Sequence, residues 1–418
     1  RDGALTSSAL RRMGHADDAR AFLDWFVPYL FPDGKVPCCV DHRGADPVTE
    51  NDADGELLYL AAEHFRITGD SATVRRHWAA LARVAAHLDS LRNTRRTPRY
   101  RAPDSLIVFG LLPPSISHEG YSAKPAYSYW DDWWGVRGLD DAGLLARVAG
   151  DAPAAARYTA AGREMRADVV ASVARSMAVH RVRTLPGAAE LGDLDPTSST
   201  IALEPAQALG DLPRDAVLAT FDSAWATLER RRQPGSTWDV FVPYEWRDVG
   251  AFIRLGQPER AHAYAAWLLT MRRPGEWNQW SEAVWREPRT PRFVGDMPHG
   301  WVASDFLRAT LDMIAYERER DSTLVVGAGI PLEWARADSG VTVRGLRTWW
   351  GPLSVRAERA GAGVRVVVSG VRPPGGIELR APFGARPASA LVNGTPATML
   401  DDGRAVLLRA PGTVEFRY

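Results

Sequence analysis

The sequence predicts a mainly α protein in which a ring of paired helices, over residues 1–320, precedes an antiparallel β-sandwich over residues 324–418. Apolar-periodic stretches recur in pairs separated by a glycine and a polar residue, which is typical of antiparallel helical hairpins. From about Leu324 the pattern changes to short alternating runs, which are typical of strands. A chain of 418 residues is long enough for two or three domains of about 100 to 200 residues each.

Glycines mark the turns of the predicted hairpins. Three turns are clear and two are weaker; they lie at Gly14, Gly69 and Gly150, and at Gly210 and Gly256. Each glycine suits the position after a helix, where the backbone needs a positive φ. Asp70 and Asp151 follow such glycines and are expected to cap the next helix.

The predicted hairpins account for most of the first 320 residues. Their paired stretches are 3–13 with 16–30, 52–68 with 71–92, 131–149 with 152–178, 202–209 with 213–231, and 246–255 with 258–273. An eleventh helix, at about 300–317, has no partner after it. Because a closed ring of six hairpins needs twelve helices, we expect a missing N-terminal segment of the same protein to supply the closing helix.

Alternating runs define the C-terminal β domain. Examples are Val341–Arg344, Leu353–Arg356, Val364–Val368 and Ala405–Leu408. The dipeptide Asn393-Gly394 is a strong signal for a two-residue hairpin turn. The region of roughly 95 residues is therefore predicted to be an antiparallel β-sandwich.

Composition excludes several classes of partner and cofactor. Basic and acidic residues number 51 each, so no net field favours nucleic acid or an anionic membrane surface. No run of about 18 apolar residues predicts a membrane-spanning helix, and we expect a soluble chain. The only cysteines, Cys38 and Cys39, are too few for a four-cysteine metal site. We expect no cofactor and no metal.

Tryptophan is the compositional outlier, with 16 in the chain. Several lie beside acidic residues in segments expected to be loops: Trp130, Trp133, Trp134, Trp277, Trp280, Trp285 and Trp301. Indole rings stack on the C–H faces of sugars, while the sugar hydroxyls need charged or amide partners. The pattern favours an oligosaccharide, polysaccharide or glycoside as substrate, although single tryptophans could equally fill the hairpin cores.

The first acidic and aromatic cluster is Tyr127–Trp134, which leads into a long predicted helix. It places Asp131 and Asp132 among five aromatic residues, a setting that could raise a carboxyl pKa as a general acid requires. Either aspartate could instead simply cap the helix. Tyr129, Trp130, Trp133 and Trp134 are candidate substrate contacts.

The second cluster is Glu276–Trp285, where Glu282 is the candidate general base and Trp280 a candidate sugar contact. A solvated surface glutamate is the alternative. Weaker candidates for substrate binding are Asp52, Asp54, His118, Glu119, Glu245, His299 and Trp301. Asp52 and Asp54 open a helix, so their charges could serve only its dipole.

At these residues the chain resembles the six-hairpin glycosidases, in particular glucoamylase-like and α-L-rhamnosidase-like enzymes. Arg1-Asp2-Gly3-Ala4-Leu5 is similar to a family segment whose aspartate holds a sugar hydroxyl, which implies Arg1 and Asp2 as substrate contacts. Trp130-Asp131-Asp132 is similar to the Trp-Glu-Glu motif that supplies the general acid, and Trp280-Ser281-Glu282 to the segment of the general base. Aspartate replaces glutamate in the acid motif, which leaves open whether Asp131 or Asp132 acts.

The resemblance implies an (α/α)6 barrel and an inverting, exo-acting glycoside hydrolase. Two alternatives remain open. A polysaccharide lyase of the α/α-toroid type would use groups such as Tyr121, His118 and His299, and a non-catalytic carbohydrate-binding protein would need no acid or base. A terpene cyclase is disfavoured, because Asp131-Asp132-Trp133-Trp134-Gly135 lacks the third, metal-binding aspartate.

Overall fold

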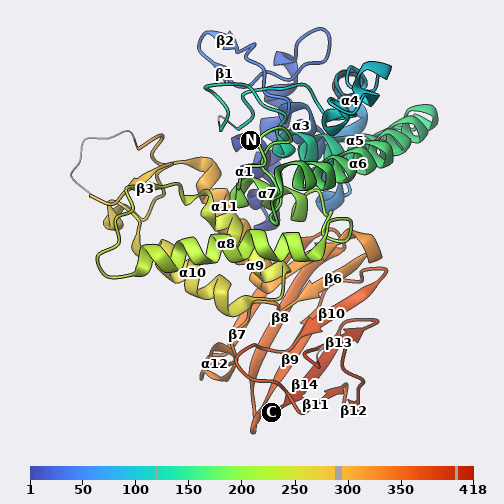
Figure 1. Ribbon diagram of the computed structural model, residues 1–418. Helices are drawn as coiled ribbons and strands as arrows, with labels where there is room; N and C mark the ends of the chain where they lie inside the picture. Colours follow the sequence, from blue (N-terminus) through green and yellow to red (C-terminus); the bar gives the residue numbers. More distant parts are fainter. Residues whose placement is uncertain (119, 288–293, 401–402) are drawn as a thin grey trace. The chain divides into compact units, whose positions relative to one another are not determined.

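The computed structural model describes residues 1–118, 120–287, 294–400 and 403–418, and it consists of two compact units (Figure 1). Unit 1 comprises Arg1–Ser7 and Asp17–Thr227. Unit 2 comprises Ser8–Ala16 and Leu228–Tyr418. The boundaries of these units do not coincide with the predicted domain boundary near residue 320. That domain boundary stays a prediction.

The helices occur in the predicted hairpin order. Their bounds are α1 Asp2–Arg12, α2 Ala16–Phe26, α3 Ala53–Thr68, α4 Ser71–Asn93, α5 Tyr129–Ala149, α6 Ala152–His180, α7 Pro196–Leu203, α8 Arg214–Arg232, α9 Trp246–Arg254, α10 Pro258–Thr270, α11 Gly300–Ile314 and α12 Leu332–Arg336. Short 3-10 turns connect them: η1 Val27–Tyr29, η2 Pro98–Arg101, η3 Leu106–Val108, η4 Pro243–Glu245, η5 Gly275–Trp277 and η6 Glu319–Asp321. In the described part of the chain, no helix has the length and apolar character needed to cross a membrane.

The cap chemistry expected from the sequence is confirmed at the clear hairpins. Gly69 and Gly150 end α3 and α5 with φ values of 72° and 88°. The Asp70 carboxylate accepts hydrogen bonds from two backbone N–H groups at the start of α4. Asp151 accepts one from Ala154 at the start of α6. These two hairpins therefore carry their own stop and start signals.

Two helix boundaries were predicted wrongly. The first helix of the fourth hairpin lies at Pro196–Leu203 rather than at 202–209. Asp195 caps it by accepting from the Ser198 N–H, and the proline at position 205 disfavours helical backbone at the residue before it. The last long helix ends at Ile314 rather than near 317, because Ala315–Arg318 forms β5, which pairs antiparallel with Thr323–Val326.

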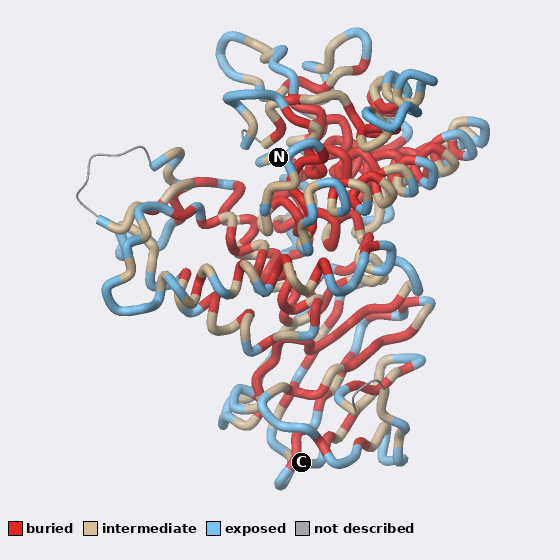
Figure 2. The backbone as a smooth tube through the Cα atoms, in the orientation of Figure 1, coloured by how far each residue is buried: buried red, intermediate tan, exposed pale blue. Residues whose placement is uncertain are grey.

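The core of unit 1 is built around the crossing of α3 and α5. A Cβ atom on Gly55 would lie 2.1 Å from the Trp134 carbonyl oxygen, and one on Gly138 would lie 2.6 Å from the Gly55 Cα. Glycines at the crossing therefore let the two backbones approach closely. Most residues of α3 and of the first half of α5 are buried, as the red parts of the tube in Figure 2 indicate. The first turn of α5 lies near the start of α3, because the Trp130 indole binds Asp52.

Strands β5 to β14 of unit 2 form two packed sheets. One has the order β13-β10-β6-β5 and the other β12-β11-β14-β9-β8-β7. The remaining strand bounds are β6 Thr323–Val326, β7 Val341–Thr348, β8 Gly351–Ala360, β9 Gly363–Ser369, β10 Gly376–Arg380, β11 Ser389–Val392, β12 Thr395–Pro396, β13 Ala405–Leu408 and β14 Gly412–Arg417. Both sheets contribute to one apolar core that includes Leu324, Val355, Ile377 and Phe416. The pairing is antiparallel except between β10 and β6.

The Asn393-Gly394 prediction is confirmed in detail. Val392 pairs with Thr395, so the loop has two residues, and both have positive φ, 49° and 84°. That is the backbone of the turn that matches the twist of the flanking strands. Four short strands lie outside the sandwich and form two small ribbons: β1 Val40–Asp41 with β2 Gly44–Ala45, and β3 Val240–Phe241 with β4 Val284–Trp285.

Candidate active site

Asp131 is the best-held carboxyl of the first cluster. It lies in the first turn of α5 and is only 1% exposed. Its two oxygens accept hydrogen bonds from the hydroxyl groups of Ser115, at 2.6 Å, and Ser117, at 2.8 Å. Burial, together with the nearby charge of Asp52, raises the pKa of Asp131 well above its usual value. The raised pKa favours the protonated form of Asp131, which is the form that a general acid needs.

Asp132 has a different environment, although it is equally buried. One of its oxygens accepts the Leu112 backbone N–H at 2.8 Å, and the other has no hydrogen-bond partner in the described structure. Burial raises the pKa of Asp132 well above its usual value as well. The carboxyl thus fastens the loop before α5 to the helix.

Asp52, in the turn that leads into α3, belongs to the same cluster. One carboxylate oxygen accepts the Trp130 indole N–H at 2.8 Å. The Arg1 guanidinium donates to Glu50 at 2.6 Å, and its Nε lies 3.9 Å from Asp52. Asp2 is exposed. Among the described residues, Arg1, Asp52, Trp130 and Asp131 are thus brought together, whereas Asp2 is not part of their hydrogen-bond network.

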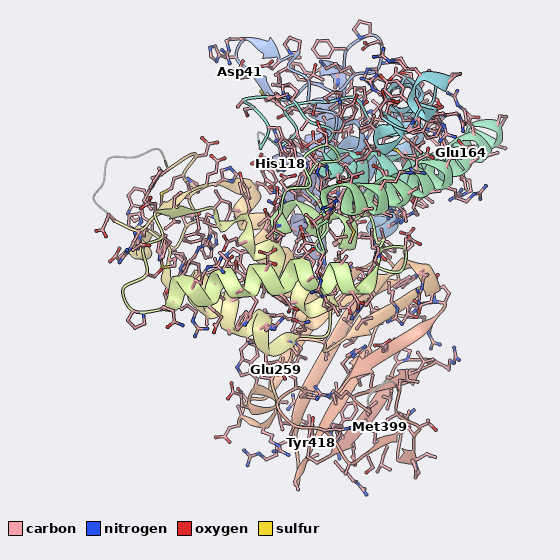
Figure 3. All side chains as sticks on the ribbon, viewed as in Figure 1. Asp41, His118, Glu164, Glu259, Met399 and Tyr418 are labelled. Atoms are coloured by element: carbon pink, nitrogen blue, oxygen red, sulfur yellow. The ribbon has the colours of Figure 1, made fainter. Side chains whose placement is uncertain are left out.

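His118 lies on the loop before α5, where Figure 3 labels it, and it extends this cluster. Its Nε2 is 2.6 Å from the Ser198 hydroxyl and 3.6 Å from Asp195. Its ring packs edge-on against Trp130, with centroids 5.1 Å apart. The next candidate, Glu119, lies outside the described residues.

Other candidates of unit 1 have partners within the fold. Trp134 is fully buried and packs against Tyr59. The Tyr129 hydroxyl is 2.8 Å from the Ser172 hydroxyl. Asp54 is bound by the Val36 N–H and by His87 Nδ1, at 3.1 and 2.6 Å. These contacts are sufficient to explain the burial of Trp134, Tyr129 and Asp54 by packing and hydrogen bonding.

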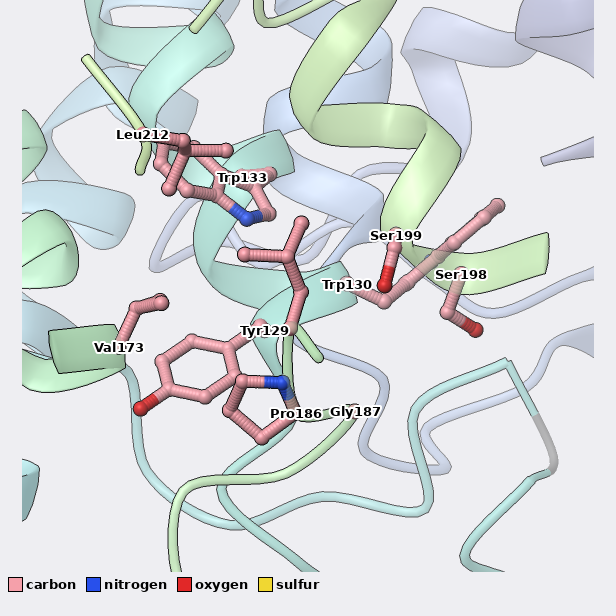
Figure 4. A pocket seen from close by; sticks show the side chains of 10 residues that line it. Tyr129, Trp130, Trp133, Val173, Pro186, Gly187, Ser198, Ser199 and Leu212 are labelled. Carbon is pink, nitrogen blue, oxygen red and sulfur yellow. The ribbon is translucent and has the colours of Figure 1, made fainter. Parts of the chain in front are cut away.

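A small cavity lies beside the first turn of α5 (Figure 4). Tyr129, Trp130 and Trp133 line it together with Ser198 and Ser199 of α7. Its volume is about 10 Å³, which is close to the minimum for a single water molecule. A sugar ring does not fit there, so Trp133 faces a packing defect rather than a substrate pocket in this conformation.

The second cluster lies in unit 2 and surrounds Glu282. The Glu282 backbone N–H donates to the Asp296 carbonyl, and the Ala283 N–H donates to the Val294 carbonyl. The carboxylate is only partly buried. Its Oε1 accepts a hydrogen bond from the Tyr244 hydroxyl at 3.2 Å. Tyr244 is also 3.3 Å from His299 Nε2.

The aromatic candidates of unit 2 divide into two groups. Trp301 stacks near Tyr244, with ring centroids 4.3 Å apart, and is therefore part of the Glu282 cluster. Trp280 is buried and packs edge-on against Trp246. Glu245 is buried, pairs with Arg231 at 2.7 Å and accepts the Tyr264 hydroxyl. Trp280 and Glu245 thus support the scaffold next to the cluster.

Sequence reasoning missed the hydroxyl partners of these carboxyls. Ser115 and Ser117 are two residues apart, a spacing at which side chains share one side of an extended backbone, although Ser117 itself has a φ of 56°. That spacing was the available signal. His118 has Ser198 and Asp195 as its partners, which lie at the start of α7 about 80 residues along the chain, so no local sequence signal links them to His118. Among the described residues, no group of three or more histidine, cysteine or acidic side chains is arranged to hold a metal ion.

No family model and no curated protein matches this chain. Solved structures do match its fold. An α-L-rhamnosidase from Dictyoglumus thermophilum has a TM-score of 0.60 at 10% identity, and the match covers 100% of this chain and 45% of that one. The chain thus spans less than half the length of that rhamnosidase. A structure described as a wild-type glycosidase has a TM-score of 0.52 at 14% identity, covering 75% of this chain and 86% of that one. The chain therefore has the rhamnosidase-like fold of a helical barrel with a C-terminal β domain, as the sequence predicts.

Proposed function

We propose that the chain is a glycoside hydrolase that acts through a carboxylic general acid in the first cluster and the carboxylate of Glu282 as general base. The observation that carries the proposal is the Asp131 carboxyl, which is buried, held by two hydroxyl groups and shifted to a raised pKa. A protonated carboxyl near neutral pH is what a glycosidic leaving oxygen needs.

The contacts favour Asp131 over Asp132 as the acid. Asp131 is bound by serine hydroxyls, which can rotate to follow a carboxyl that gains or loses its proton. Asp132 is bound by a fixed backbone N–H, whose loss would release the loop at Leu112. Asp131 also lies beside Asp52, whose charge contributes to the raised pKa of Asp131 and whose carboxylate accepts the Trp130 indole N–H.

Two features of Glu282 support its role as general base. It is only partly buried, and one of its carboxylate oxygens accepts a hydrogen bond from the Tyr244 hydroxyl. A partly exposed carboxylate can hold a water molecule. In an inverting mechanism, the acid protonates the leaving oxygen while the base deprotonates a water that attacks the opposite face of the sugar. That geometry requires roughly 6.5–9.5 Å between the two carboxyls.

The substrate class we propose is a terminal sugar of a glycoside or oligosaccharide, with α-L-rhamnosides as the first class to screen. The fold likeness to an α-L-rhamnosidase motivates this choice. The test is a panel of aryl glycosides of rhamnose, glucose and uronic acids, followed by NMR of the first-formed anomer. Release of the inverted anomer is expected. A retained configuration would overturn the inverting mechanism, and no hydrolysis of any member would overturn the hydrolase proposal.

The lyase alternative receives less support. Tyr121 would be its base, yet the Tyr121 hydroxyl donates to Asp193 at 3.0 Å. Burial and that carboxylate raise the pKa of Tyr121, which opposes deprotonation. An unsaturated, ultraviolet-absorbing product from acidic glycans would nevertheless favour the lyase.

A further inference from the structure

Tyr244 lies in η4, and its hydroxyl joins two motifs that are distant in sequence. It is 3.2 Å from Glu282 Oε1 and 3.3 Å from His299 Nε2. Tyrosine has a single hydroxyl proton, so only one of these contacts can use Tyr244 as the donor. The direction of the hydrogen bonds therefore decides what Tyr244 does to the carboxylate.

The cap of α11 sets this direction. His299 is the residue before α11, and its Nδ1 accepts the backbone N–H of Val302 at 3.3 Å. A ring nitrogen that accepts a hydrogen bond carries no proton, so the proton of the neutral imidazole lies on Nε2. Nε2 then donates to the Tyr244 oxygen, and the Tyr244 proton is left to donate to Glu282.

Packing fixes the position of the Tyr244 ring. Trp301 lies against it, and the Arg247 guanidinium lies 5.1 Å from the centroids of both rings. Arg247 is in turn 3.3 Å from the buried carboxylate of Asp305. The tyrosine hydroxyl therefore has a fixed location from which it can orient a carboxylate.

The two oxygens of Glu282 are thereby made different. Oε1 accepts from Tyr244, whereas Oε2 has no hydrogen-bond partner among the residues that the structure describes. Oε2 lies against Gly295, where a Cβ atom would come within 2.0 Å of it. The anchored oxygen fixes the carboxylate plane, and the other oxygen is left for solvent.

We propose that Tyr244 and His299 are positioning residues that orient Glu282 so that Oε2 is the oxygen that removes a proton from water. The inference rests on the proposed function of Glu282 as general base. In the reaction, the water oxygen bonds to the anomeric carbon, the glycosidic C–O bond breaks, and the leaving oxygen takes the proton of the acid. The water proton goes to Oε2 and stays there until solvent removes it. His299 does not relay it, because Nε2 already carries a proton and Nδ1 is held by the cap.

The experiment compares variants that separate the hydroxyl from the ring. Tyr244→Phe keeps the ring against Trp301 and removes the donor, so we expect kcat to fall about 10- to 100-fold with KM changed less than about twofold. His299→Asn can still accept the Val302 N–H at the start of α11, but it loses the Nε2 donor to Tyr244. His299→Gln has a longer side chain whose amide N–H can again donate to Tyr244. We expect His299→Asn to lower kcat about 3- to 10-fold and His299→Gln to recover part of that loss. Tyr316→Phe, which removes another buried hydroxyl of unit 2, is the matched control and should leave kcat unchanged.

The outcomes separate this inference from the proposed function. An inactive Glu282→Gln variant beside a fully active Tyr244→Phe variant would overturn the positioning role and leave the hydrolase proposal intact. A fully active Glu282→Gln variant would overturn the general base, and the positioning role with it. Melting temperatures by circular dichroism identify any variant that fails to fold. If Tyr244→Phe fails to fold, the test uses the kcat values of His299→Asn and His299→Gln instead. If these two variants have the same kcat as each other, the inference is overturned.

Discussion

The Asp131 and Glu282 clusters place their carboxyls in opposite environments. Asp131 lies at the start of a helix, is almost completely buried and accepts from two hydroxyl groups. Glu282 lies in a loop, is partly exposed and has one oxygen bound by a tyrosine. Burial favours the protonated form of a carboxyl, and access to solvent suits one that must accept a proton from water. The difference supports the proposed roles of Asp131 as general acid and Glu282 as general base.

Glu282→Gln is expected to have the largest effect. The amide cannot accept a proton from water, so kcat should fall by about 10⁴-fold, the upper end of the range for general base catalysis. Because the side chain is partly exposed and lies in a loop, the melting temperature should change little. Steady-state kinetics on the best glycoside of the panel, with circular dichroism, checks both. If activity is lost only because the variant unfolds, the result would not support different roles for Asp131 and Glu282.

Asp131→Asn should lower kcat by about 10²- to 10³-fold for a glycoside with an alkyl leaving group. A dinitrophenyl leaving group needs no protonation, so its hydrolysis should fall much less. The ratio of the two rates is the measurement. If Asp132→Asn, and not Asp131→Asn, shows this dependence on the leaving group, the acid is Asp132.

Gly295→Ala sharpens the account of the base. Gly295 has a φ of +67°, and its added Cβ would displace the Glu282 carboxylate. We expect kcat to fall about 10- to 100-fold, since small displacements of reacting groups are costly. Gly256→Ala is the control, because Gly256 has a φ of +75° and a methyl group added there would meet no atom within 4 Å. Equal kcat in the two alanine variants would contradict the proposed contact.

Asp132→Asn should have the smallest effect, and on stability rather than on rate. The folded state raises the pKa of Asp132, so the folded chain keeps a proton that the unfolded chain releases as pH increases. The carboxyl therefore destabilises the fold increasingly above its unfolded pKa. We expect the variant to gain melting temperature over the parent, more at pH 8 than at pH 5. Asp17→Asn, at a solvent-exposed carboxylate, should show no such trend.

Local signals explain which parts of the fold could be predicted. Gly69, Asp70 and Asn393 act on their own backbone or on neighbours a few residues away, so the sequence is sufficient to locate them. The boundary of α7 was missed because the apolar pattern of 202–209 outweighed the proline at position 205. The strand at 315–318 was missed because its pairing partner, not its composition, makes it extended.

The candidate site was predictable only as far as the acidic groups themselves. Asp131 and Glu282 lie in aromatic clusters that can be read from the sequence. Their partners Ser115 and Tyr244 lie 16 and 38 residues away, and no periodicity links such positions. For Trp134 and Trp280, the neighbouring acid suggests a sugar contact, and this stays a prediction; the structure shows that both rings are buried against other aromatic residues.

The first helix has a consequence for how the chain is made. Residues 8–16 belong to unit 2, where Arg12 binds Asp312 at 2.7 Å and the Ala315 carbonyl at 2.6 Å. Arg12 leaves the ribosome 300 residues before its partner. At synthesis rates of about 5–20 residues per second, that is a wait of about 15–60 s. Unit 2 therefore cannot finish folding in the order of translation, and during this interval the buried arginine is exposed on a nascent chain whose counter-charge has not yet been synthesised.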